Sequence, residues 1–298
     1  MFVRDWLLAV IVWFGLPAPG VAEDAAIFCT GQAVQGGLLL CEAPAGSTLV
    51  ISGPDGEARR DVRVNAEGIA TIGLLRTETL DLYIASAHHD IPLQIVTLAE
   101  RDDPFRTIEG LDCDKVDART EEQKAHASRS WVKKQDAFGT FSDGNGARTG
   151  FIRPSVGPMS SPFGPARKYI GVGQDGEPCE KTSVHYGYDI ATPVGTEIIA
   201  PAGGTVTLGD PDLYYEGGTV FLDHGDGLVS VFMHMSEVDV TPGQVVAAGE
   251  RLGASGNTGR TTGPHLHWAV KWRNPLSDDR SRDFYIDPAL LLELEPAG

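Results

Sequence analysis

Two histidines separated by a single residue are the first candidates for chemistry in this chain. His265 and His267 begin a segment, residues 265–272, in which residues alternate between two faces of different character. This alternation predicts a β-strand with one face packed on a core and the other open to a site. Alternate residues of a strand lie about 6.5 Å apart, so one imidazole can bind a metal while the other contacts its water. The pair alone could equally be two histidines on a strand surface.

A second group of polar residues lies in the segment VHYGYDI, residues 184–190. If this segment is one strand, His185 and Asp189 share a face, with the small Gly187 between them. A buried structural histidine–aspartate pair is the alternative. His234, near the end of a further predicted strand, also fits a site better than a surface.

All five candidates lie between residues 151 and 298: His185, Asp189, His234, His265 and His267. Two imidazoles and a carboxylate leave a zinc ion one open position for water, which is the arrangement of a catalytic site. No cysteines have the Cys-x-x-Cys spacing of a closed structural zinc site. The donor types therefore favour a catalytic metal centre over a structural one.

The other four histidines fit structural or surface roles. His88 and His89 are adjacent in sequence, so they point to opposite faces of any strand and cannot easily share a ligand. His126 falls in a predicted helix, where we expect it to be solvated. His224 falls at a predicted hairpin tip, where it is structural or exposed.

The composition is that of a globular protein, and its first residues indicate export. The chain has 298 residues, 42% hydrophobic and 22% charged, enough for about two domains with cores. Its net charge of −17 argues against a nucleic-acid partner, because phosphate binding needs clustered Lys and Arg. Residues 1–22 have the pattern of a secretory signal peptide. Their apolar run is shorter than the about 20 residues that span a bilayer, so we expect no membrane span after cleavage; an uncleaved anchor is the alternative.

The four cysteines fit this compartment, because exported proteins form disulfides. Three pairings are possible. We favour Cys29–Cys41 within one domain and Cys113–Cys179 between a linker and a second domain. No cysteine follows the predicted cleavage region, which argues against a lipoprotein.

We expect a mostly β protein with two domains. Residues 23–105 show short strands separated by turns, which predicts a small immunoglobulin-like β-sandwich; the strands are 37–41, 48–52, 61–64, 68–73, 80–86 and 93–97. Residues 106–150 are expected to be a short linker with one helix near residues 118–137, followed by a flexible connection or exposed loop. Residues 151–298 again consist of short strands and turns and form the C-terminal antiparallel β domain, in which residues 171–180 are expected to be an irregular insertion.

Five motifs in the C-terminal part resemble a known family. HYGYD, APAGGTV, HGDGLVSVFMHMS, GNTGRTTG and GPHLHW occur in the order of the lysostaphin-type (LytM-domain) zinc endopeptidases. The resemblance covers about residues 154–291, and GQAVQGGLLLC and TIEGLDCDKV upstream are similar to exported bacterial members. The insertion containing Cys179, and Met233 and Met235 beside His234, depart from the family pattern and bear on the shape of the cleft.

The resemblance implies roles for the five candidates. His185, Asp189 and His267 would bind one zinc ion (Zn²⁺), His265 would be the general base, and His234 would orient the water or stabilise the oxyanion. The implied activity is a zinc metalloendopeptidase that hydrolyses cross-link or stem peptides of bacterial peptidoglycan, in the periplasm or after secretion.

The sequence leaves alternatives to this function. The protein could be a non-catalytic regulator of this fold that activates a cell-wall amidase, although such members typically lack metal ligands. It could also be a latent peptidase, with the cleft blocked by the N-terminal domain or by residues 171–180. The N-terminal domain could instead bind a cell-envelope protein partner.

Overall fold

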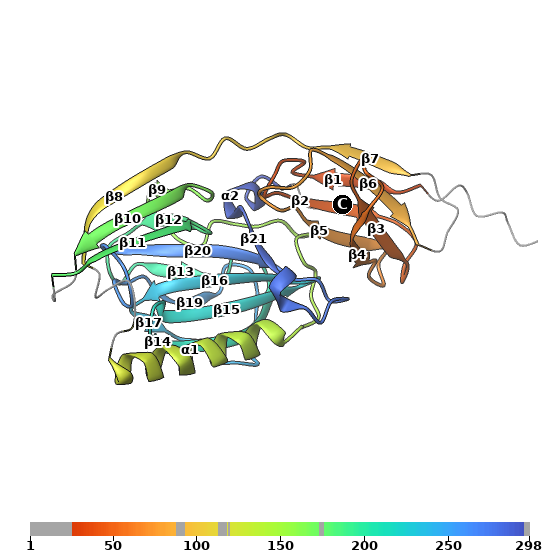
Figure 1. Ribbon diagram of the computed structural model, residues 1–298. Helices are drawn as coiled ribbons and strands as arrows, with labels where there is room; N and C mark the ends of the chain where they lie inside the picture. Colours follow the sequence, from red (N-terminus) through yellow and green to blue (C-terminus); the bar gives the residue numbers. More distant parts are fainter. Residues whose placement is uncertain (1–25, 88–92, 113–117, 119, 173–175, 295–298) are drawn as a thin grey trace, which may run out of the picture.

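The computed structural model describes residues 26–87, 93–112, 118, 120–172 and 176–294, and they are mostly β-structure, as predicted. Figure 1 shows an N-terminal β unit, a larger C-terminal β unit, and the chain arching between them into strand β8. The predicted signal peptide, His88 and His89 lie outside the described residues. No described helix is long and apolar enough to cross a membrane.

The N-terminal unit is a β-sandwich, as predicted, with two antiparallel sheets in the orders β1-β2-β5 and β4-β3-β6-β7. Its strands are β1 (Phe28–Gly31), β2 (Leu38–Glu42), β3 (Thr48–Ser52), β4 (Ala58–Arg63), β5 (Ile69–Gly73), β6 (Asp81–Ser86) and β7 (Gln94–Thr97). Alternate residues of β3 and β6 are fully buried, which explains why period-two patterns located these strands. The predicted Cys29–Cys41 disulfide is confirmed; it joins directly paired residues of β2 and β1, a strand that the sequence prediction missed.

The C-terminal unit is built on one large sheet, in the order β18-β14-β15-β16-β20-β12-β9, with β21 paired to β20. Its strands are β9 (Met159–Ser161), β12 (Tyr188–Ala191), β14 (Gly204–Leu213), β15 (Gly217–Gly225), β16 (Leu228–Met235), β18 (Val245–Val246), β20 (His265–Trp272) and β21 (Phe284–Ile286). A smaller sheet has the order β13-β19-β17, with bounds Glu197–Ile199, Arg251–Ala254 and Glu237–Val238. Short helices at Arg280–Arg282 (η2) and Pro288–Leu291 (α2) follow β20.

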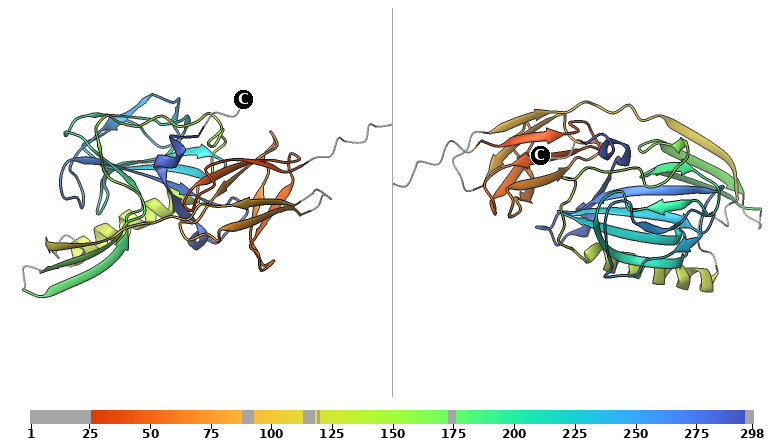
Figure 2. Two further views of the ribbon diagram at one scale, coloured as in Figure 1. Left: turned by 90° about the horizontal axis from the view of Figure 1, so that it is seen from above. Right: turned by 180° about the vertical axis from the view of Figure 1, so that it is seen from behind.

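A third sheet corrects the prediction for residues 171–180. Instead of an irregular insertion, β10 (Ala166–Val172) and β11 (Pro178–Val184) pair antiparallel along their whole lengths. Strand β8 (Phe105–Asp112), from the predicted linker, pairs parallel with β10, and the two run side by side in both views of Figure 2. This pairing joins strands far apart in sequence, so local patterns could not reveal it. Cys113 lies outside the described residues, and its pairing with Cys179 stays a prediction.

Helix α1 (Glu121–Gly139) is the predicted linker helix, and it packs along the large sheet beside β14 (Figure 1). It begins at a capping box: the Thr120 hydroxyl accepts from the Gln123 amide, and the Gln123 side chain accepts from the Thr120 amide. At its other end the buried Arg273 donates to the Phe138 carbonyl. The following residues lack regular structure, as predicted, but Ala147 is fully buried, so this part is not a freely exposed loop.

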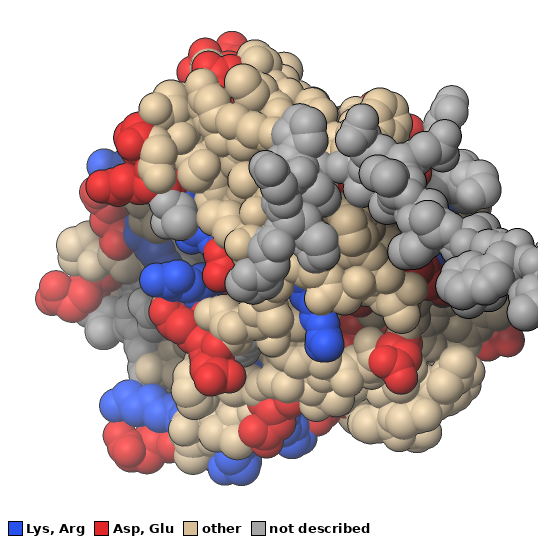
Figure 3. Space-filling model, turned by 90° about the vertical axis from the view of Figure 1, so that its right-hand side faces the viewer, with Lys and Arg blue, Asp and Glu red and all other residues tan. Residues whose placement is uncertain are grey.

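The two β units share one hydrophobic core. The Trp272 ring, at the end of β20, packs so closely on β5 that a Cβ on Gly73 would lie 2.5 Å from it. The Trp272 indole donates to the Thr71 carbonyl at 3.0 Å, and Arg101 forms an ion pair with Asp287 across the same boundary. On the face drawn in Figure 3, the basic and acidic side chains of the described residues are interspersed.

Candidate metal centre

Adjacent strands bring three of the predicted residues together. His267 on β20 lies directly opposite Asp189 on β12, and His185 follows the end of β11. The expectation that residues 184–190 form one strand is therefore wrong, because the chain leaves β11 at Val184 and enters β12 at Tyr188. The turn between them passes over the His267 ring at Gly187, where a Cβ would lie 2.3 Å from that ring.

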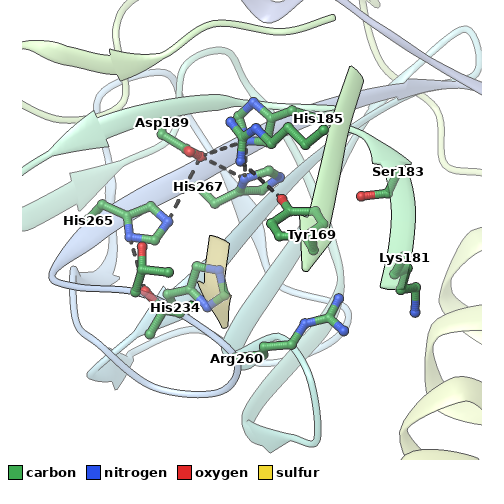
Figure 4. A pocket seen from close by; sticks show the side chains of 13 residues that line it. Tyr169, Lys181, Ser183, His185, Asp189, His234, Arg260, His265 and His267 are labelled. Atoms are coloured by element: carbon green, nitrogen blue, oxygen red, sulfur yellow. Dashed lines mark hydrogen bonds and ion pairs between the residues drawn. The ribbon is translucent and has the colours of Figure 1, made fainter. Parts of the chain in front are cut away.

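Three donor atoms converge in a triangle (Figure 4). His185 Nε2 lies 3.1 Å from Asp189 Oδ1 and 3.3 Å from His267 Nδ1, and the last two atoms are 2.8 Å apart. Zinc binds imidazole nitrogen and carboxylate oxygen at about 2.0–2.2 Å, so the ligands of a tetrahedral ion lie about 3.3 Å apart. The triangle is close to this size, so these three residues fit a tetrahedral metal ion with one position left open.

The surroundings of His185 and Asp189 favour the binding of a cation by these two side chains. The Pro162 carbonyl lies 2.7 Å from His185 Nδ1, so Nδ1 donates there and Nε2 keeps its lone pair. Burial opposes ionisation of Asp189, but the interactions with His185 and His267 outweigh it and hold the pKa of this carboxyl well below its usual range. The site therefore offers an ionised carboxylate at neutral pH.

The other two histidines lie beside the triangle. His265 Nε2 is 3.9 Å from Asp189 Oδ1, and the His265 and His234 rings are 4.9 Å apart. The Nδ1 atoms of both rings donate to backbone carbonyls, that of His265 to Gly263 at 2.8 Å and that of His234 to Thr258 at 2.9 Å. The Nε2 atom of each ring is therefore the one that faces the cleft.

His234 is held in a form that stays neutral. Burial, and then the neighbouring imidazoles of His267 and His265, lower its pKa to about 3. Its backbone lies in the left-handed region, at φ 63°, which is uncommon for a residue other than glycine. The hydrogen bond from its amide to the Glu216 carbonyl, at 2.8 Å, holds it there.

Helix α1 supports the loop that holds His234. Lys134 pairs with the Glu216 carboxylate, and Lys133 pairs with Asp210. The Ser130 hydroxyl accepts from the Tyr214 amide at 3.1 Å. A predicted linker helix is thus connected to the site, which the sequence could not indicate because the paired residues are about 80 positions apart.

The remaining histidines are structural or peripheral. His224 is fully buried, with Nδ1 2.9 Å from the Gly203 carbonyl and Nε2 2.8 Å from the Ser230 hydroxyl. The structural alternative predicted for it is confirmed, and the exposed one is wrong. His126 is only partly exposed, since Nε2 contacts the Asp212 carbonyl at 2.8 Å.

The five histidine and aspartate side chains open into a cleft of about 520 Å³. One wall is the β8–β10–β11 sheet, and the facing loop is residues 260–262. Sequence reasoning missed the wall residues, although the alternation of Arg167 and Tyr169 is typical of two residues on one face of a strand. The cleft is lined by Gly110, Arg167, Tyr169, Lys181, Ser183, His185, Asp189, His234, Arg260, Thr261, Thr262, His265 and His267.

Comparisons with known proteins agree with this geometry. Residues 183–279 match peptidase family M23. An uncharacterized metalloprotease of Haemophilus influenzae is 42% identical over 113 residues, which cover 37% of this chain and 22% of that protein. The peptidoglycan DD-endopeptidase ShyA of Vibrio cholerae is 38% identical over 91 residues, 30% of this chain and 21% of that protein. The chain thus spans about a fifth of the length of these curated relatives.

The likeness to a solved structure is more extensive. A crystal structure from Pseudomonas aeruginosa, described as that of a peptidase M23, has 26% sequence identity and a TM-score of 0.55. The match covers 90% of this chain and 97% of that chain. It therefore includes the N-terminal unit as well as the unit that holds the donor triangle.

Proposed function

We propose that the protein is a zinc-dependent endopeptidase acting on cross-link or stem peptides of bacterial peptidoglycan, because residues 183–279 match peptidase family M23. The observation that carries the proposal is the donor triangle of His185, Asp189 and His267 at the floor of an open cleft. The name of the Vibrio cholerae relative supports peptidoglycan as the substrate. Residues 1–22 would direct the protein to the periplasm or the medium.

His185, Asp189 and His267 would hold the zinc ion. When bound, the ion would polarise the scissile carbonyl and lower the pKa of a water molecule from about 15.7 to about 7. Asp189, with its lowered pKa, would offset part of the ion's charge and leave a net positive centre suited to a developing oxyanion. Pro162 fixes the His185 ring through Nδ1, so that Nε2 faces the triangle.

His265 would act as the general base. Its Nδ1 proton is engaged by the Gly263 carbonyl, so the proton taken from water would be accepted at Nε2. This atom lies on the side of the ring facing Asp189, within the cleft.

For His234, the sequence left two roles open, and the hydrogen bonds favour one of them. The Thr258 carbonyl engages the Nδ1 proton, and the lowered pKa keeps Nε2 unprotonated. An unprotonated Nε2 can accept a hydrogen bond from water but cannot donate one to an oxyanion. We therefore assign His234 to orienting the water.

The domain organisation belongs to the same proposal: a signal peptide at 1–22, a sandwich domain at 23–105, a linker at 106–150 and a peptidase domain at 151–298. A cell-envelope partner of the sandwich stays a prediction. The regulator that activates an amidase remains the rival function, but it would not need a complete donor triangle. The latent form would need the β8–β10–β11 wall to exclude substrate.

The test is cleavage of cross-linked sacculi. Purified protein with zinc is incubated with sacculi, and the released muropeptides are analysed. We expect new peptide ends with the wild type and none with His267→Ala. Equal products from both proteins, or no products from a wild type loaded with zinc, would contradict the proposal.

A further inference from the structure

The wall of the cleft presents one face of the β10–β11 hairpin to the donor triangle. In this hairpin Arg167 lies opposite Ser183, and Tyr169 lies opposite Lys181. Opposed residues of antiparallel strands share a face, and all four line the cleft. Figure 4 shows Tyr169, Lys181 and Ser183 on the two strands of this wall, with Arg260 on the facing loop.

Basic side chains outnumber acidic ones in the described lining of this cleft. Among the described residues that line it, Arg167, Lys181 and Arg260 are basic, and Asp189 is acidic but belongs to the donor triangle. The whole chain has a net charge of −17. Basic side chains in a cleft attract negatively charged ligands.

Arg167 is the best placed of the three. It is half-buried at the base of β10, and its guanidinium donates to the Ser161 hydroxyl and, at 3.4 Å, to the Tyr169 hydroxyl. Ser161 in turn lies 3.3 Å from His185 Nδ1, so Arg167 sits next to the donor triangle. No described carboxylate lies within ion-pair distance of Arg167.

We propose that Arg167 forms a carboxylate-binding subsite beside the donor triangle, which makes the enzyme selective for peptides with a free carboxylate near the scissile bond. The guanidinium has five N–H groups, and two hydrogen bonds to neutral hydroxyls leave donors for an anion. Its planar fork matches a carboxylate, to which arginine binds through two parallel hydrogen bonds. This inference rests on the proposed function and specifies the substrate class.

The carboxylate could belong to a side chain or to the peptide's C-terminus. Three synthetic peptides containing the bond cleaved in sacculi distinguish these sources. One has all carboxylates free, one has the side-chain carboxylates amidated, and one has the C-terminal carboxylate amidated. With the wild type, kcat/KM should fall about tenfold or more for the peptide that lacks the bound carboxylate, because a hydrogen bond between charged groups is lost.

Arg167→Gln should lose most of this difference between peptides. Lys168→Gln is the matched control, because Lys168 is the next residue of β10, points to the other face and pairs with Glu180. Discrimination retained by Arg167→Gln, or lost equally by Lys168→Gln, would overturn the subsite. Should Arg167→Gln lose its zinc or its folded structure, Arg167→Lys replaces it, because lysine keeps the charge but lacks the planar fork, with an expected loss of about twofold to fivefold; unchanged discrimination would then overturn the subsite.

The experiment separates the two hypotheses. A wild type that cleaves all three peptides equally refutes the carboxylate subsite but leaves the endopeptidase function intact. A wild type that is loaded with zinc and does not cleave sacculi refutes both.

Discussion

Gly187→Ala should abolish tight metal binding without changing any proposed ligand. Gly187 crosses the face of the His267 ring, and a Cβ there would lie 2.3 Å from both Cε1 and Nε2. Ordinary van der Waals contact begins at 3.4 Å. The His267 ring, or the turn that carries His185, must therefore shift by about 1 Å. Ligand distances at a metal site tolerate only about 0.2 Å.

The expected loss follows from that displacement. Mutation of residues that merely support ligands lowers metal affinity 10- to 100-fold, and here a ligand itself must move. We therefore expect the zinc dissociation constant to rise at least about 100-fold, or about 2.7 kcal/mol. Competition with a chelator measures this constant, and thermal unfolding of the metal-free protein checks that the variant is folded.

Gly203→Ala is the control, because its new Cβ would meet nothing closer than a carbonyl oxygen at 3.6 Å. It should bind zinc as the wild type does. A folded Gly187→Ala protein that binds zinc within about threefold of the wild type would refute the argument that this close approach fixes the ligand geometry.

Three further predictions follow from the site and its supports. His267→Ala should lose zinc, whereas His265→Ala should keep a full equivalent and lose turnover; metal analysis beside the sacculus assay distinguishes them, and equal zinc loss would contradict the assigned roles. Burial lowers the pKa of His224 to about 4. Between pH 6.5 and 4 the unfolded chain therefore binds a proton at this residue that the folded chain does not bind, and the free energy of unfolding should fall by about 3 kcal/mol. Urea unfolding should show a flatter dependence on pH for His224→Gln, and an unchanged slope would count against this assignment. Lys134→Met leaves a buried carboxylate unpaired and should cost about 3–5 kcal/mol and lower kcat at full zinc occupancy, whereas Lys124→Met, whose partner Glu121 has a side chain that is 93% exposed, should cost less than about 1 kcal/mol; equal effects would contradict a supporting role for Lys134.

The shared core also limits how latency can be tested. Deleting residues 23–150 would remove β8 and α1 and expose Trp272, which is now 1% exposed. Lower activity of such a truncated protein would therefore not argue against latency. Substitutions that loosen β8 alone are the appropriate variants.

The sequence by itself determined the features that depend on neighbours along the chain. Period-two alternation located β20 and most strands of the sandwich, because each such strand buries alternate residues. The Gly-rich and polar turns marked where strands end, and the composition of residues 118–137 located α1. The types and spacing of five residues predicted a metal centre because zinc needs those donors.

Only the tertiary structure decided how these residues are oriented and what surrounds them. The Nδ1 partners of His185, His234 and His265 are backbone carbonyls, which every residue possesses, so no residue type could reveal them. The β8–β10 pairing and the Lys134–Glu216 pair join segments about 60 to 80 positions apart. Such contacts form only when the chain folds back on itself, and they determine the wall of the cleft and the support of its histidines.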